Sequence, residues 1–62
     1  MTFDEQANEC ARDLLGRTLT DHERGLVYHY LPSHIIQVAN DWGWDDTEVG
    51  DYVWRTVKDH IK

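Results

Sequence analysis

The strongest constraint on the fold is a helical spacing of apolar residues with very little to interrupt it. The 62 residues contain one proline and four glycines, the residue types that most often end a helix. Between these breaks the apolar residues recur three or four positions apart, which indicates one face of an α-helix rather than a strand. The sequence therefore predicts an all-α fold, a small bundle of three to four helices in which residues 1–62 form a single domain.

Capping and breaking residues divide the chain into four predicted helices. The predicted breaks are Gly16, Pro32 and Gly43. The predicted N-caps are Thr2 and Thr20, each followed three residues later by the glutamate of a capping box (Glu5 and Glu23), then Ser33, and finally Asp45 or Asp46. A side-chain oxygen at each of these caps can accept a hydrogen bond from a free amide of the first helical turn.

The four helices should bury one apolar stripe each. The predicted stripes are Phe3, Ala7, Cys10, Ala11 and Leu14; Leu26, Val27, Tyr30 and Leu31; Ile35, Ile36, Val38, Ala39 and Trp42; and Val49, Tyr52, Val53, Val57 and Ile61. Trp44 is also expected in the core. Trp54 lies at the border of the last stripe, beside the helical positions of Gly50 and Lys58, so it either packs or projects as an anchor for a partner.

Length and charge limit the partners of such a chain. Twelve acidic residues against six basic ones give a net charge of −6, which disfavours nucleic acids and anionic lipid surfaces and favours basic protein surfaces. A domain of this size has a small core, and one cysteine cannot form an intrachain disulfide. Partner binding, or a homodimer, is therefore expected to add stability. No signal sequence follows Met1, so a cytoplasmic location is expected.

Residues 35–54 resemble a helix-turn-helix. Ala39 stands where that motif has a small residue and Gly43 where it turns, with apolar positions on both sides (Val38, Trp42, Trp44, Val49 and Tyr52). The resemblance implies a DNA-binding regulator. The Trp42-Gly43-Trp44 sequence is also similar to the Met-Gly-Phe-type loop of ubiquitin-associated domains, which implies protein recognition through the loop and the final helix.

The charge of this segment favours a protein partner over DNA. Five acids and no base lie between residues 41 and 51, namely Asp41, Asp45, Asp46, Glu48 and Asp51. A reading helix with this composition would bring carboxylates against phosphates. The acids can simply cap and solvate the helix. Alternatively, residues 45, 48 and 51 form a ridge with steps of about 4.5 Å, like that of a DNA mimic or a small phage-type inhibitor.

Catalytic and metal-binding patterns are weak. The four histidines (His22, His29, His34 and His60) lack metal-ligand spacing, and Cys10 lies on an apolar stripe. We therefore expect no enzyme, no cofactor and no metal site. The sequence predicts a protein-binding module or inhibitor that uses Asp41, Asp45, Asp46, Glu48, Asp51 and Trp54 to occlude a basic surface of its partner.

Overall fold

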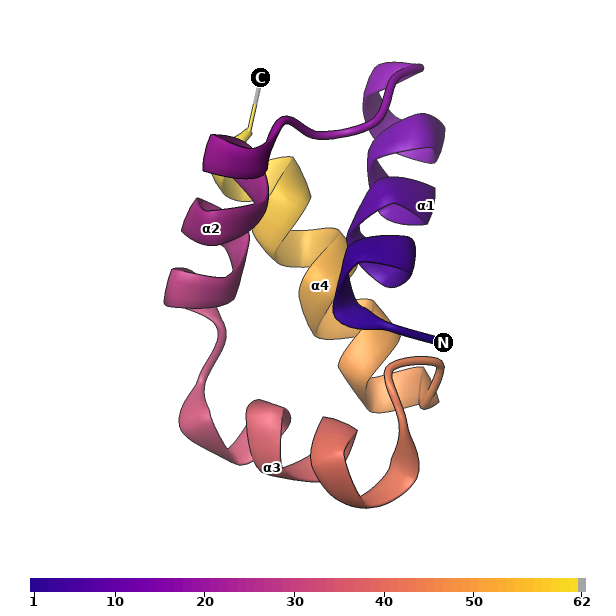
Figure 1. Ribbon diagram of the computed structural model, residues 1–62, viewed down its shortest axis with the longest axis vertical. Coiled ribbons are helices and arrows are strands. Elements are labelled where there is room, and N and C mark those ends of the chain that lie inside the picture. Colours follow the sequence, from indigo (N-terminus) through magenta and orange to yellow (C-terminus); the bar gives the residue numbers. More distant parts are fainter. Residues whose placement is uncertain (62) are drawn as a thin grey trace.

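The computed structural model describes residues 1–61, which form four α-helices: α1 (Phe3–Leu15), α2 (Asp21–Tyr30), α3 (Ser33–Trp42) and α4 (Thr47–His60). α4 packs against each of the other three helices, and most extensively against α1. In Figure 1, α4 runs diagonally behind α1 and α2, and α3 lies across the lower end of the molecule. The predicted all-α fold is confirmed.

The core is made of small and medium-sized side chains from all four helices and from the connections. The buried apolar residues are Ala7, Cys10, Ala11, Leu19, Val27, Leu31, Ile35, Ala39, Val49, Val53, Val57 and Ile61. The valines of α4 lie at its centre, fully buried. Most of the predicted stripes are thus confirmed, but two of their aromatic residues are exposed: Tyr30 at 50% and Trp42 at 76%. The Tyr30 ring lies instead against the outside of α4, stacked on His60 with 3.9 Å between ring centroids.

Both capping boxes are present. Thr2 accepts a hydrogen bond from the Glu5 amide and Glu5 accepts one from the Thr2 amide, while Thr20 and Glu23 repeat this pair of bonds at the start of α2. Gly16 has φ 73°, in the left-handed region where a glycine can end a helix without strain. The local signals at the ends of α1 and at the start of α2 therefore fix these boundaries.

The other helix starts differ in detail from the prediction. Ser33 is not a cap but the first residue of α3. Pro32 occupies the cap position, and its carbonyl accepts the first helical hydrogen bonds, from the Ile35 and Ile36 amides. Asp46 caps α4, which begins at Thr47. Asp45 therefore lies outside the helix, in the turn.

A short turn at Gly43 joins α3 to α4, as the helix-turn-helix prediction required. Gly43 has φ 99°, which a residue with a Cβ rarely adopts, and its amide donates to the Ala39 carbonyl to close α3. The Gln6 side chain of α1 donates a 2.7 Å hydrogen bond to the Trp44 carbonyl. This bond ties the turn to the first helix. Of the helices in residues 1–61, none is long and apolar enough to cross a membrane.

Candidate interaction surface

The five acidic residues 41–51 lie around the turn between α3 and α4. Asp41 is in the last turn of α3, Asp45 and Asp46 are in the turn, and Glu48 and Asp51 are in the first two turns of α4. Because Asp45 precedes the helix, the predicted three-residue ridge on one helix is wrong. Only Glu48 and Asp51 keep that spacing on α4.

Two of the five acids have clear structural roles. The Asp46 carboxylate accepts hydrogen bonds from the Glu48 and Val49 amides, at 3.0 and 3.4 Å, and so caps α4. Asp51 forms an ion pair of 2.8 Å with Arg55, one helical turn later. These two carboxylates are engaged within the chain, so they are the weaker candidates for contact with a partner.

The other three acids have no cationic partner among residues 1–61. Asp41 accepts one hydrogen bond, from the Gln37 side-chain amide at 3.2 Å, and Asp45 and Glu48 are exposed. Apart from the pair between Asp51 and Arg55, the ion pairs that the structure describes involve α1, α2 and the connection between them. This part of the surface therefore carries uncompensated negative charge.

Trp54 is at the edge of α4, as its helical position predicts. It is 37% exposed, and the Lys58 ammonium nitrogen lies 5.2 Å from the centroid of its ring, within cation–π range. It does not fill the space above Gly50. The Gln6 amide occupies that space, since a Cβ added to Gly50 would lie 2.8 Å from its nitrogen.

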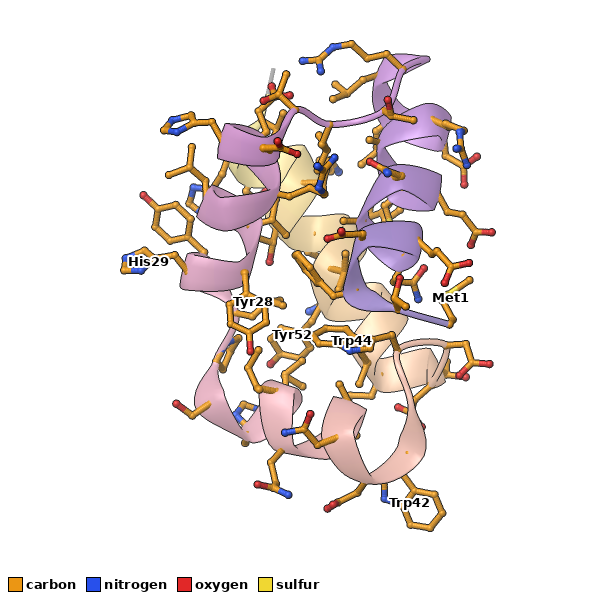
Figure 2. The ribbon with its side chains drawn as sticks, in the orientation of Figure 1. Met1, Tyr28, His29, Trp42, Trp44 and Tyr52 are labelled. Carbon is orange, nitrogen blue, oxygen red and sulfur yellow. The ribbon has the colours of Figure 1, made fainter. Side chains whose placement is uncertain are left out.

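The structure adds Trp42 to the candidate residues, in contradiction to its predicted place in the core. Figure 2 shows its side chain pointing away from the helices at the lower end of the molecule. By helical spacing Trp42 shares a face with Ile35 and Ala39. However, α3 packs only against α4, so no other helix extends far enough to cover its final residue. Helical periodicity gives the direction of a side chain and not the presence of a neighbour there.

Trp44 takes the packed position instead. Its ring meets Phe3 edge-on, with 5.1 Å between centroids, and lies 6.3 Å from Tyr28. Phe3 and Tyr28 also meet edge-on, at 5.2 Å. In Figure 2, Trp44 lies beside Tyr28 and Tyr52 in the middle of the molecule. The prediction that Trp44 packs on the core is confirmed.

The basic residues that could have supported DNA binding are largely engaged in ion pairs. Arg17 pairs with Glu23 at 2.8 Å, and Arg24 pairs with Asp21 and Asp4. The Arg17 hydrogen bond and the Thr20 amide lower the pKa of Glu23 from 4.5 to about 2. Arg12 is exposed in the last turn of α1. Ion pairs therefore neutralise Arg17, in the connection between α1 and α2, and Arg24 of α2.

Few features of the described chain suggest chemistry. Residues 1–61 contain no detectable pocket and no group of three or more side chains able to hold a metal ion. Cys10 is buried between helices, and its burial, with the nearby Asp13 and Glu9 charges, raises the pKa of its thiol to about 11. A thiol in this state is a poor nucleophile at neutral pH.

Comparisons with protein-family models, with curated proteins and with solved structures find no match to this chain.

Proposed function

We propose that this chain is a small, non-enzymatic protein-binding module that places the acidic turn between α3 and α4 on a basic surface of a partner. The observation that carries the proposal is the uncompensated charge of Asp41, Asp45 and Glu48. Other carboxylates in the chain, such as Glu23 and Asp51, are paired with arginines of the same chain. Glu9 and Asp13 of α1 are also exposed without a described ion pair, but they lie on one helix away from the turn. Asp41, Asp45 and Glu48 are gathered around a single turn, and a group of acids without a cation is suited to an external one.

The proposed mechanism is steric occlusion with electrostatic steering. A negative patch on an acidic chain accelerates encounter with a basic surface, and this acceleration weakens as salt screens the charges. If the basic surface is itself a binding site for nucleic acid or another anion, occupying it inhibits the partner. The chain would act in the cytoplasm as such an inhibitor.

A DNA-binding regulator is the second candidate, supported by the turn at Gly43 between α3 and α4. Glu48 and Asp51 on α4 oppose it, as do the ion pairs that occupy Arg17 and Arg24. A gel-shift titration with random DNA at low salt separates the two. The protein-binding proposal expects no shift, and a salt-sensitive shift would favour the DNA-binding candidate.

A ubiquitin-associated-like module is a third reading of the same turn. In that case Trp44→Ala should weaken partner binding more than it weakens folding. The contacts of Trp44 with Phe3 and Tyr28 favour the opposite result, a loss of stability. Urea denaturation of the variant, measured beside its partner binding, distinguishes the two effects.

Charge reversal at matched positions tests the main proposal. The tagged protein is used to capture partners from an extract of its host, beside two double variants. Asp45→Lys/Glu48→Lys reverses exposed acids of the turn, and Glu9→Lys/Asp13→Lys reverses exposed acids of α1, with the same change in net charge. Asp46 and Asp51 are left intact because they cap and pair within the chain.

The expected result is a basic protein captured by the wild type and by the Glu9/Asp13 variant, and lost by the Asp45/Glu48 variant. The capture should also weaken as sodium chloride is raised. Equal capture by all three proteins would contradict the proposal, because the position of the charge would then be irrelevant.

A further inference from the structure

The three tryptophans of this chain differ in what their rings contact. Trp44 packs against Phe3 and Tyr28. Trp54 has a cation of its own chain, Lys58, over its ring. Trp42 is 76% exposed, and no aromatic ring or cation among residues 1–61 contacts it. An indole held at the surface without any of these contacts is unusual in a monomer, because tryptophan buries more apolar area than most side chains.

Two carboxylates lie near Trp42 along the chain. Asp41 precedes it, and the Asp45 carboxylate turns back toward Gly43, with one oxygen 2.9 Å from the place of a Gly43 Cβ. The last turn of α3 contains no basic residue. The free carbonyls at the end of this helix therefore add their negative dipole without compensation from within α3. Trp42 thus projects from an electronegative corner of the molecule (Figure 2).

We propose that Trp42 is the aromatic anchor of the interaction surface and that it receives an arginine side chain of a basic protein partner. A guanidinium can stack on the face of an indole while its N–H groups, which lie in the same plane, reach carboxylates beside the ring. Asp41 and Asp45 flank Trp42 in the sequence and can accept those hydrogen bonds. The inference rests on the proposed function and adds the chemistry of the group that is recognised.

A second copy of this chain fits the corner less well. A symmetric dimer through Trp42 would bring the Asp41 and Asp45 carboxylates of two copies together, in a protein that already carries a net charge of −6. Like charges at such a contact cost free energy, whereas a cationic partner removes the repulsion. The occupant suited to this corner is therefore basic.

The test uses a hexa-arginine peptide as the probe and a hexalysine peptide for comparison. Binding to the ¹⁵N-labelled full chain at low salt is followed by NMR, in which each tryptophan indole N–H gives its own peak. We expect hexa-arginine to shift the Trp42 indole peak more than those of Trp44 and Trp54, and to bind more tightly than hexalysine. Sedimentation of the free protein shows whether Trp42 joins two copies instead.

Substitutions separate stacking from simple apolar contact. Trp42→Ala and Trp42→Leu should both weaken hexa-arginine binding about two- to fivefold, because leucine has no π face, and Trp42→Phe should weaken it less. Tyr30→Ala removes a half-exposed aromatic ring outside the interaction surface; it is the matched control and should leave the affinity unchanged. Urea denaturation of each variant checks that the fold is kept, as the exposure of Trp42 leads us to expect.

Three results would overturn the inference. The first is that Trp42→Ala keeps full affinity for hexa-arginine while Asp45→Lys/Glu48→Lys loses it. This result would show that Trp42 is not the anchor, but it would still support the acidic surface and the proposed function. The second is full affinity in Trp42→Leu, which makes the contact merely apolar. The third is a concentration-dependent dimer that Trp42→Ala abolishes. If hexa-arginine binds none of the proteins, or binds all of them equally, both the inference and the acidic surface lose their support.

Discussion

Val53 and Trp42 show how far burial, rather than side-chain size, determines what a residue contributes to stability. Val53 is fully buried at the middle of α4, the helix that packs against the other three. Trp42 is the larger side chain but is 76% exposed at the end of α3. Because the hydrophobic contribution follows the apolar area removed from water, the valine should matter more to folding than the tryptophan.

Val53→Ala should lower the free energy of unfolding by about 1–3 kcal/mol, because it removes buried methyl groups and leaves a cavity. Trp42→Ala should change it by less than about 0.5 kcal/mol. Urea denaturation followed by far-UV circular dichroism measures both. A loss at Trp42→Ala as large as that at Val53→Ala would show that Trp42 packs on the fold after all.

The two tryptophans beside Gly43 show where residue-by-residue prediction stops. Both were predicted to lie in the core, Trp42 from its spacing to Ala39, and only Trp44 packs against the core, where it is partly buried. Trp44 is covered because Phe3, from the other end of the chain, reaches it. The sequence around Trp42 does not show whether another part of the chain covers its side chain, so its exposure could be found only from the tertiary arrangement.

At the scale of helices, ends were more predictable than contacts. The two capping boxes are complete within four residues each, so the sequence alone identifies them. Where α1 meets α4, the Gln6 side chain lies over Gly50 and bonds to the Trp44 carbonyl in the turn. Because glutamine is polar, the apolar pattern of the sequence could not predict this contact. The same limit applies to the candidate surface: its acidic residues could be named in advance, but which of them are paired could not.

The start of α2 should respond to acid. Hydrogen bonds from Arg17 and from the Thr20 amide hold the pKa of Glu23 down, from 4.5 to about 2, so the folded state favours the ionised carboxylate. The stabilisation is complete above about pH 4.5 and is lost as pH falls toward 2, because the unfolded chain then binds the proton first. We expect thermal midpoints between pH 2 and 6 to fall less steeply in Glu23→Gln than in the wild type. Asp13→Asn makes the same charge change at an exposed site without an ion pair, so its thermal midpoints should fall with pH as steeply as those of the wild type. Equal slopes for all three proteins would contradict the role assigned to Glu23.

Two helical glycines should respond differently to alanine. A Cβ at Gly25 of α2 meets nothing within 4 Å, so Gly25→Ala should stabilise the protein by about 0.5–1 kcal/mol through helix propensity. A Cβ at Gly50 of α4 would lie 2.8 Å from the Gln6 amide nitrogen and displace it from the Trp44 carbonyl. Gly50→Ala should therefore fall short of the Gly25→Ala gain by about 0.5–1.5 kcal/mol, the value of one hydrogen bond.

A double-mutant cycle isolates this contact. In a Gln6→Ala background the amide is absent, so Gly50→Ala should recover the full gain of about 0.5–1 kcal/mol. Urea denaturation of the four proteins gives the coupling free energy. A coupling near zero would mean that the Gln6 side chain moves aside without cost.

Across the whole molecule, charge and packing are distributed differently. The Arg17–Glu23 pair lies near the connection of α1 to α2, at the upper end in Figure 1, whereas the unpaired Asp41 and Asp45 lie at the opposite end, around the end of α3. Packing has no such division, because α4 contacts all three other helices. The turn thus gathers several unpaired acids while the fold remains a single packed unit, so a charge change at the turn should alter binding with little effect on folding.

Cys10 can report whether the four helices unfold together, because it is the sole cysteine of the chain and is buried on the side of α1 that faces the core. Its low exposure and the raised pKa of about 11 both suppress reaction of the folded protein with a thiol reagent such as DTNB. Reaction should then require opening of the structure. If α1 cannot leave α4 without unfolding the rest, the opening free energy from labelling should equal the global free energy of unfolding from urea. For a domain of this size the free energy of unfolding is about 3–5 kcal/mol, which slows labelling roughly 10²- to 10⁴-fold relative to the urea-unfolded chain.

As a control, a cysteine at the exposed position of Ser33, made as Ser33→Cys in a Cys10→Ala background, should react without delay. Labelling of Cys10 that is much faster than the urea value allows would show that α1 opens alone, and would assign the stable part of the fold to α2, α3 and α4.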